Sequence, residues 1–344
     1  MGKISIGVDA DNGDVLKGKK PVQRIVPAVV KLSKKMPEIE FVLAGNESDI
    51  CKYSLTENIR VLNATAIDSD PHSRRPAKDS SLRVLAEELA HERISGIYSI
   101  GSTAKICAVA QFNVGRFPEL ENGMIPGLLA HIPSKQGIMA VMDLGASTEQ
   151  NVSNSYAHAI IAASYMAHFI GNKHPRLGIH SNGTEKYKGN IFEKSLDEKL
   201  GSSKKLSELF HYVGKIDRIF EGEADIIITD GSSGNKDLKI IEGTADFLNW
   251  NLRQRIKNMK PLRKARFYLG AAIAGLGELK EGLTQDLDPR DYNCGLALGF
   301  NGVFGKGHGI SDQRAVMGGL MLAVRYAGAD INVKIRKDLK QYKE

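Results

Sequence analysis

Cysteine is scarce in this sequence: only 3 of its 344 residues are cysteine. Cys51, Cys107 and Cys294 stand far apart, and no Cys-x-x-Cys pair occurs. An odd number of widely spaced cysteines indicates neither a disulfide framework nor a thiolate zinc site. We therefore expect a reducing, cytoplasmic environment.

Long apolar runs are missing as well. No stretch approaches the roughly 20 apolar residues that a membrane span needs. The start, MGKISIGVDADNGD, has no basic segment followed by an apolar segment and a cleavage site. We expect a soluble protein that at most associates peripherally with a membrane.

Acidic residues are outnumbered, 40 against 47 basic ones, which gives a formal net charge of +7. This balance favours acidic partners: nucleic acid, anionic lipid, phosphate esters or an acidic protein. Charge alone does not choose among them.

Familiar catalytic patterns are also absent. The sequence has no GxGxxG after its first strand-like run, no GxxxxGK(S/T) and no GxSxG, which disfavours dinucleotide enzymes, phosphate-loop enzymes and serine hydrolases. His158, His168 and His174 are ten and six residues apart, which does not suit a two-histidine metal face. We expect no metal and no cofactor.

What the chain does contain is an alternation of short, continuously apolar runs with helix-like segments. Continuous apolar runs are typical of parallel strands that are covered on both faces. The strand-like runs are 4–8, 40–44, 59–64, 96–101, 137–145, 175–183, 224–231, 296–300 and 303–309. The helix-like segments are 22–36, 80–94, 103–114, 154–171 and 311–328. This alternation predicts a doubly wound α/β sheet with ligands at the carboxyl ends of its strands.

One segment breaks this alternation. Residues 251–266 carry seven basic residues and no acidic one, with apolar residues between them and a break at Pro261. We predict a helix–break–helix excursion over about 244–270, basic on one side and apolar on the other.

Glycine-rich loops follow the predicted strands. Small residues let backbone N–H groups approach an anion, most readily at a helix N-terminus. Each loop alone is more often a glycine turn with a helix cap, and it is their joint occurrence that favours an anion site. We interpret 231–235 as an anion-facing loop, followed by a helix that packs through Leu238, Ile241, Ala245 and Leu248. The six loops are 9–14, 101–105, 143–148, 181–190, 230–236 and 306–312.

Taken in order, these segments resemble the bacterial phosphate acyltransferase of phospholipid synthesis, the PlsX family. The resemblance spans nearly the whole chain, and its two longest motifs are the most specific. The matching segments are DSSLR (79–83), SIGSTAK (99–105), DLGAST (143–148), PRLGIHSNGTEKYKGN (175–190), DGSSGNKDLKIIEG (230–243) and GKGHGISD (305–312).

The resemblance implies a fold, an activity and partners. The fold is a three-layer α/β/α sandwich related to isopropylmalate dehydrogenases and phosphotransacetylases, here one domain over 1–344 with a projecting helical pair. The activity is transfer of a fatty acyl group from acyl carrier protein to inorganic phosphate. The implied protein is a homodimer that contacts anionic membrane peripherally, and nucleic acid is not among its partners.

Phosphate is itself the nucleophile in this reaction, which agrees with the missing nucleophile motifs. We predict Lys188 as the cation on phosphate or the developing oxyanion and Asn235 as a hydrogen-bond donor. We expect Asp230 to orient its loop or to cap the following helix. Asp79 and Arg83 match an element of the family, but a buried structural ion pair between them would explain their presence equally well. Further predicted phosphate- or substrate-binding residues are Gly183, Thr184, Gly189, Asn190, Asp230, Gly231, Ser232, Ser233, Gly234 and His308.

The basic excursion has three compatible interpretations: contact with anionic lipid, docking of acyl carrier protein, or a dimer contact. The predicted membrane- or partner-binding residues are Trp250, Arg253, Arg255, Lys257, Lys260, Arg263 and Phe267.

Two other functions stay open. The acyl donor could be a coenzyme A thioester, as in phosphotransacetylases, or the fold could be a non-catalytic sensor of acyl groups or phosphoanions. The sensor hypothesis rests on departures from the family pattern at Asp11, Ser147 and Ser232, and the matching Lys188 and Asn235 speak against it.

Overall fold

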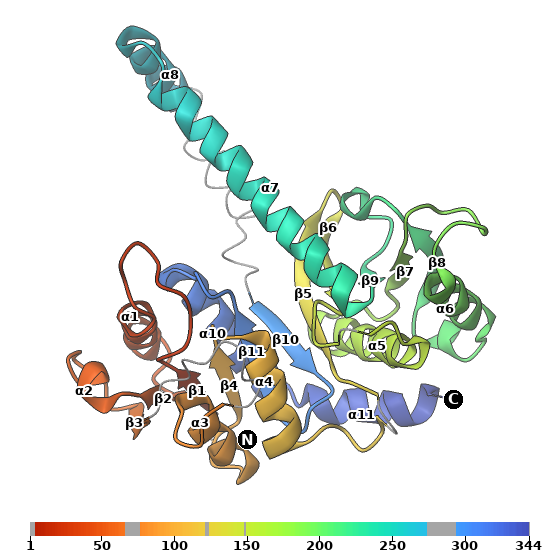
Figure 1. Ribbon diagram of the computed structural model, residues 1–344, viewed down its shortest axis with the longest axis horizontal. Coiled ribbons are helices and arrows are strands. Elements are labelled where there is room, and N and C mark those ends of the chain that lie inside the picture. Colours follow the sequence, from red (N-terminus) through yellow and green to blue (C-terminus); the bar gives the residue numbers. More distant parts are fainter. Residues whose placement is uncertain (1–3, 66–75, 121–123, 148, 274–293, 344) are drawn as a thin grey trace.

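A computed structural model of the chain describes residues 4–65, 76–120, 124–147, 149–273 and 294–343. One sheet of 11 strands runs through the molecule in the order β3-β2-β1-β4-β11-β10-β5-β6-β9-β7-β8 (Figure 1). The strands are β1 (Ser5–Asp9), β2 (Glu40–Gly45), β3 (Ile59–Asn63), β4 (Gly96–Ser99), β5 (Gly127–Ser134), β6 (Gly137–Met142), β7 (Arg176–His180), β8 (His211–Ile216), β9 (Ile226–Ile228), β10 (Cys294–Leu298) and β11 (Val303–Gly307).

The sheet consists of two parallel halves. Strands β3, β2, β1, β4 and β11 are parallel to one another, and so are β6, β9, β7 and β8. Antiparallel pairing through β10 and β5 joins the two halves. The prediction of a doubly wound, mostly parallel sheet is confirmed, and only this central pair of strands departs from it.

Helices cover both faces of the sheet because apolar residues on each helix face it. In the first half, Ile25 of α1 and Leu320 of α10 belong to one core cluster, and Leu85 of α3 and Ile106 of α4 belong to another. Burying one such side chain stabilises the fold by about 1.5–3 kcal/mol. These helices are α1 (Val22–Ser33), α2 (Glu47–Ile50), α3 (Ser81–Ala90), α4 (Thr103–Val109) and α10 (Gln313–Ala327).

The second half is built in the same way. The strongly apolar helix α5 packs against α6 and α11, and its Ile160 and Ile161 are fully buried. Short π-helical turns at 110–114 and 166–170 extend α4 and α5. The helices of this half are α5 (Val152–Tyr165), α6 (Ile191–Ser202) and α11 (Ile331–Tyr342), with single 3₁₀ turns at Leu206–Glu208 and Ile219–Glu221.

Two helices project from this body, α7 (Gly231–Lys257) and α8 (Pro261–Ile273), as Figure 1 shows. At 27 residues, α7 is roughly 40 Å long, and Pro261 occupies the first position of α8, where its missing N–H costs nothing. The predicted helix–break–helix is confirmed, but α7 has no boundary near 244. Within the part of the chain that the structure describes, no helix is both long and apolar enough to cross a membrane.

The region after β9 corrects the sequence interpretation. Residues 231–235 are the first turns of α7 and not a loop, because Asp230 caps the helix immediately after the strand. Leu238 and Ile241 pack against the core as expected, but Leu248 is 61% exposed because α7 has left the body by that point.

Candidate functional site

Asp230 determines how α7 begins. Its Oδ1 accepts hydrogen bonds from the N–H groups of Ser232 at 3.0 Å and Ser233 at 2.9 Å, and its carbonyl accepts from the N–H of Gly234. Burial of the carboxyl raises its pKa, but bonds from Ser233, Gln150 and Ser232 outweigh burial and hold the pKa below the usual value. Asp230 therefore caps α7. Its carboxylate accepts hydrogen bonds from N–H groups that the sequence analysis predicts to face an anion.

Gly231 and Gly234 allow this helix end to pack closely. A Cβ on Gly231 would overlap the carbonyl oxygen of Ser147, and one on Gly234 would overlap that of Asp143. Asn235 follows directly, and its side chain lies against Gly145. The glycines of this motif thus bring the predicted catalytic Asn235 against the loop that follows β6.

That loop is folded around the buried carboxylate of Asp143. Asp143 accepts hydrogen bonds from the N–H groups of Leu128 (2.9 Å), Gly145 (3.2 Å), Ala146 (3.0 Å) and Ser147 (2.7 Å). A carboxylate that accepts this many bonds fixes the backbone around it. Ser147, one of the departures from the family pattern, is held here with its side chain buried.

The loop over 181–190 is organised by a different group, the buried ammonium of Lys215 on β8. Its Nζ donates to the carbonyls of Glu185 at 2.8 Å, Lys186 at 3.3 Å and Lys188 at 2.9 Å. Lys188 itself is exposed, and its ammonium lies 5.9 Å from the ring centroid of Tyr187. The fold therefore fixes the backbone at Lys188 and leaves its side chain in solvent.

The other residues predicted in this loop have local structural contacts. Asn190 caps α6 by accepting from the N–H of Glu193 at 2.9 Å, and the N–H of Gly189 donates to Asn182 at 3.0 Å. Gly183 lies against the side chain of Lys188, and Thr184 is exposed.

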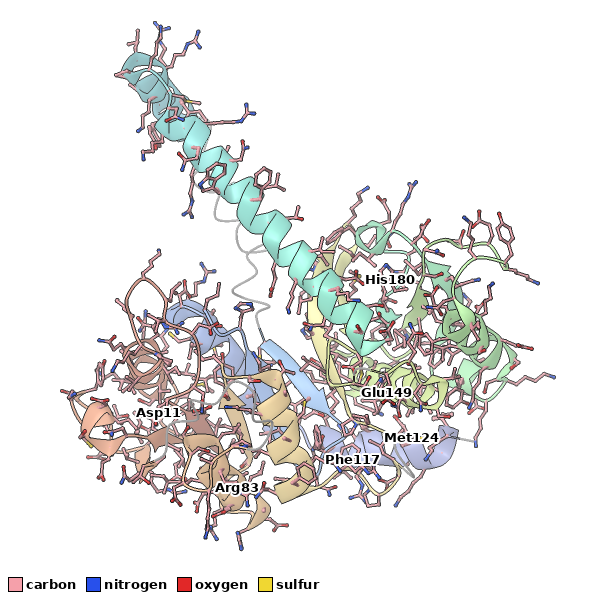
Figure 2. All side chains as sticks on the ribbon, viewed as in Figure 1. Asp11, Arg83, Phe117, Met124, Glu149 and His180 are labelled. Carbon is pink, nitrogen blue, oxygen red and sulfur yellow. The ribbon has the colours of Figure 1, made fainter. Side chains whose placement is uncertain are left out.

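Helix α7 contacts both halves of the sheet through two histidines. His180, at the end of β7, lies 3.0 Å from the carboxylate of Asp237, and His308, after β11, lies 3.3 Å from that of Glu242. Figure 2 shows His180 beside the base of α7. These contacts bring the 181–190 loop, the start of α7 and the predicted His308 into one region. Lys188 and Asn235 belong to this region, although no hydrogen bond or ion pair among the described residues joins them.

The loop after β1 is built around Asp9, which is fully buried. Asp9 accepts from Ser81 at 2.6 Å, Ser99 at 2.5 Å and the amide of Asn12 at 3.1 Å. The N–H of Asp11 also donates to Asp9 at 3.3 Å, and the carboxylate of Asp11 accepts from the N–H of Asn46 at 3.1 Å. Burial, together with the charge of Asp9, raises the pKa of Asp11 to about 6.

In the motif over 305–312, the sequence analysis predicts a role for the glycines and His308 but none for Lys306. It is the last residue but one of β11, beside β4 and β10, and burial lowers its pKa to about 8. The one available signal was a lysine directly after the apolar run of β11.

One prediction concerns the charged residues Asp79 and Arg83. Arg83 lies 3.7 Å from Glu87 one turn further along α3, and Asp79 is exposed, so the prediction of a buried ion pair between Arg83 and Asp79 is wrong.

Among the described residues no group of three or more histidine, cysteine or acidic side chains could hold a metal ion.

The projecting helices expose the residues predicted to meet a partner. Trp250 is 57% exposed and stacks on Phe247, and Phe267 is 41% exposed. The side chains of Arg253, Arg255, Lys257, Lys260 and Arg263 are all exposed as well. This surface combines aromatic and basic groups over both α7 and α8.

Comparison with known proteins agrees with these observations. The family model for fatty acid synthesis proteins matches residues 5–334. A phosphate acyltransferase from Petrotoga mobilis is 33% identical over 97% of this chain and 99% of its own length. Another, from Halorhodospira halophila, is 30% identical over 94% of this chain and 93% of its own.

Solved structures support the fold. A branched-chain phosphotransacylase from Enterococcus faecalis superposes with a TM-score of 0.55 at 11% identity, covering 95% of this chain and 99% of that one. A phosphotransacetylase from Staphylococcus aureus gives a TM-score of 0.52 at 10% identity, covering 95% of this chain and 94% of that one.

Proposed function

Because this chain belongs to the family of fatty acid synthesis proteins, we propose that it is a phosphate acyltransferase that moves a fatty acyl group from acyl carrier protein to inorganic phosphate. One observation carries the proposal: the two most specific motifs, 175–190 and 230–243, meet in the fold through His180 and Asp237. Both are also built on buried charged groups, Lys215 and Asp230, that fix their backbones.

The chemistry needs no protein nucleophile. A phosphate oxygen attacks the thioester carbonyl carbon, the new C–O bond forms, and the C–S bond breaks. The proton that hydrogen phosphate loses goes to the departing thiolate, so that the products are an acyl phosphate and a free thiol. The protein must hold the phosphate and stabilise negative charge on the carbonyl oxygen. We assign the first task to Lys188 and a donated hydrogen bond to Asn235.

The decisive assay incubates the protein with palmitoyl-acyl carrier protein, or with palmitoyl-coenzyme A, plus phosphate, and traps acyl phosphate as its hydroxamate. Hydroxamate from the carrier-protein thioester is the expected result. Product from coenzyme A alone would move the function to a phosphotransacetylase-like enzyme. If neither thioester yields product, both enzyme functions are excluded and a binding role stands.

Lys188→Ala tests the assigned cation. We expect kcat/KM for phosphate to fall about a hundred-fold, because a cation aimed at a transferring group contributes on that order. Lys186→Ala, two residues away in the same exposed loop, is the matched control and should stay close to wild type. Unchanged turnover of Lys188→Ala would remove this residue from the mechanism.

The basic, aromatic surface of α7 and α8 is proposed to contact anionic membrane, with Trp250 and Phe267 as anchors. The same surface is positive enough to receive an acidic carrier protein, and we further propose a homodimer.

Liposome flotation tests the membrane contact. In a variant carrying Arg255→Glu, Lys257→Glu and Arg263→Glu, we expect partitioning onto anionic vesicles to fall by about a hundred-fold or more, since each basic residue near such a surface contributes about 1 kcal/mol. The control carries Lys34→Glu, Lys204→Glu and Lys337→Glu, which change the net charge equally at exposed positions on the body. Equal recovery of both variants would leave the surface to the carrier protein or the dimer partner.

A further inference from the structure

A half-buried lysine near the carboxyl end of β11, Lys306, has no part in the proposed function. Lys306 pairs in register with Ser99 of β4 and Gly295 of β10. Because side chains alternate along a strand, it lies on the same face as Phe304, whose core cluster includes residues of α4 and α7. Its ammonium donates a hydrogen bond to the neighbouring carbonyl of Gly307.

The groups that face Lys306 come from four elements. They are Cys294 on β10, Glu242 on α7, Asp14 after β1 and Cys107 on α4. The charges of the two carboxylates, Glu242 and Asp14, act against the lowering of the Lys306 pKa by burial. Burial raises the pKa of both thiols to about 12, so they stay neutral at ordinary pH.

Neither carboxylate neutralises Lys306 directly. Among the described residues Lys306 forms no ion pair within 4.0 Å: Glu242 is paired with His308, and the carboxylate of Asp14 lies against Gly309. An ammonium that is partly removed from water and has no close counter-ion is costly. An anion that binds beside Lys306 would therefore gain more electrostatic free energy than one beside an exposed lysine such as Lys188, because the surroundings of Lys306 screen the charge less.

The place also suits a phosphate. Lys306 lies where strand-end loops of the first half meet α7, and those loops are glycine-rich and touch one another: Gly13 lies against Ile100 and Gly309. Glu242, the α7 residue that faces Lys306, is seven residues after Asn235. Two turns of α7, roughly 10 Å, therefore separate Glu242 from Asn235.

We propose that Lys306 is a second cation that binds the phosphate nucleophile, at the point where α7 crosses from one half of the sheet to the other. This inference rests on the proposed function and adds a half-buried cation on a strand to the exposed Lys188.

Kinetics with varied phosphate test it. For Lys306→Met we expect kcat/KM for phosphate to fall about a hundred-fold, mostly through KM, while KM for the acyl thioester changes less than threefold. Lys337→Met, which removes an exposed charge on α11, should match wild type. If Lys306→Met stays within threefold of wild type, the proposal is overturned.

The pH profile separates a phosphate contact from a structural role. Above pH 8 phosphate is already the dianion, so a further fall of kcat/KM in wild type reports loss of the Lys306 proton, whose pKa is about 8. Lys306→Arg keeps its charge, and its profile should stay level to about pH 9.5. If both proteins show the same profile, Lys306 does not hold phosphate. This comparison also decides the matter if Lys306→Met fails to fold.

Phosphate binding without turnover distinguishes failure of this inference from failure of the proposed function. If wild type makes no acyl phosphate, the thermal shift caused by inorganic phosphate is measured instead. A shift present in wild type and Lys337→Met but lost in Lys306→Met supports Lys306 as the anion site, and equal shifts in all three, or none in wild type, overturn it.

Discussion

Replacing Gly234 with alanine is expected to destabilise the protein by about 3 kcal/mol or more, the range of severe overpacking, and to abolish acyl phosphate formation. The added Cβ would lie well inside 3.0 Å of the carbonyl oxygen of Asp143, which belongs to the backbone and cannot rotate away. Helix α7 would have to move off the 143–147 loop and carry Asn235 with it.

Gly243→Ala is the matched control because it makes the same substitution in the same helix. Nothing lies within 4 Å of the added Cβ at Gly243. Alanine should therefore stabilise α7 by about 0.5–1 kcal/mol through its higher helix propensity. Urea unfolding measures the stability of both variants. It is followed by far-ultraviolet circular dichroism and not by tryptophan fluorescence, because the one tryptophan of the chain, Trp250, lies on the exposed part of α7. A loss below 0.5 kcal/mol for Gly234→Ala would contradict the close packing.

Asp143→Ala should cost about 4 kcal/mol, because the substitution leaves four backbone N–H groups without their acceptor and each unsatisfied buried donor costs about 1–3 kcal/mol. Three of these donors lie in the 145–147 turn, which packs against Gly231, so activity should fall at least as far as it does for Lys188→Ala. The fourth, from Leu128, anchors the start of β5.

Two comparisons sharpen this expectation. Asp143→Asn keeps one acceptor oxygen and should lose about half as much stability. Asp217→Ala removes an exposed aspartate after β8 and should unfold as wild type does. If Asp143→Ala unfolds at the wild-type urea concentration, the carboxylate does not organise the turn.

Much of the fold could be predicted because burial on both faces leaves a simple pattern. Strand β9 is short and continuously apolar, and β2 is apolar after its first residue. The helices between the strands repeat apolar residues at helical spacing. The helix α11 was overlooked although Ile331, Ile335 and Leu339 carry that spacing, since its charged residues resemble a solvated tail. Strands β5 and β8 were also missed, because HYVGKI and GLLAHIPS interrupt their apolar residues with histidine, glycine or proline.

By itself the sequence determined the parallel α/β architecture, the helical pair that ends in α8, and the family, because these depend on local periodicity and on motifs that are contiguous in the chain. The tertiary structure decided which polar groups remain available to bind a ligand. Capping by Asp230 takes up the N–H groups of 232 and 233, and the pairing of β11 between β4 and β10 leaves Lys306 half-buried on the strand face that α4 and α7 cover. Burial and hydrogen-bond partners arise from residues far apart in the chain, so local spacing carries no record of them.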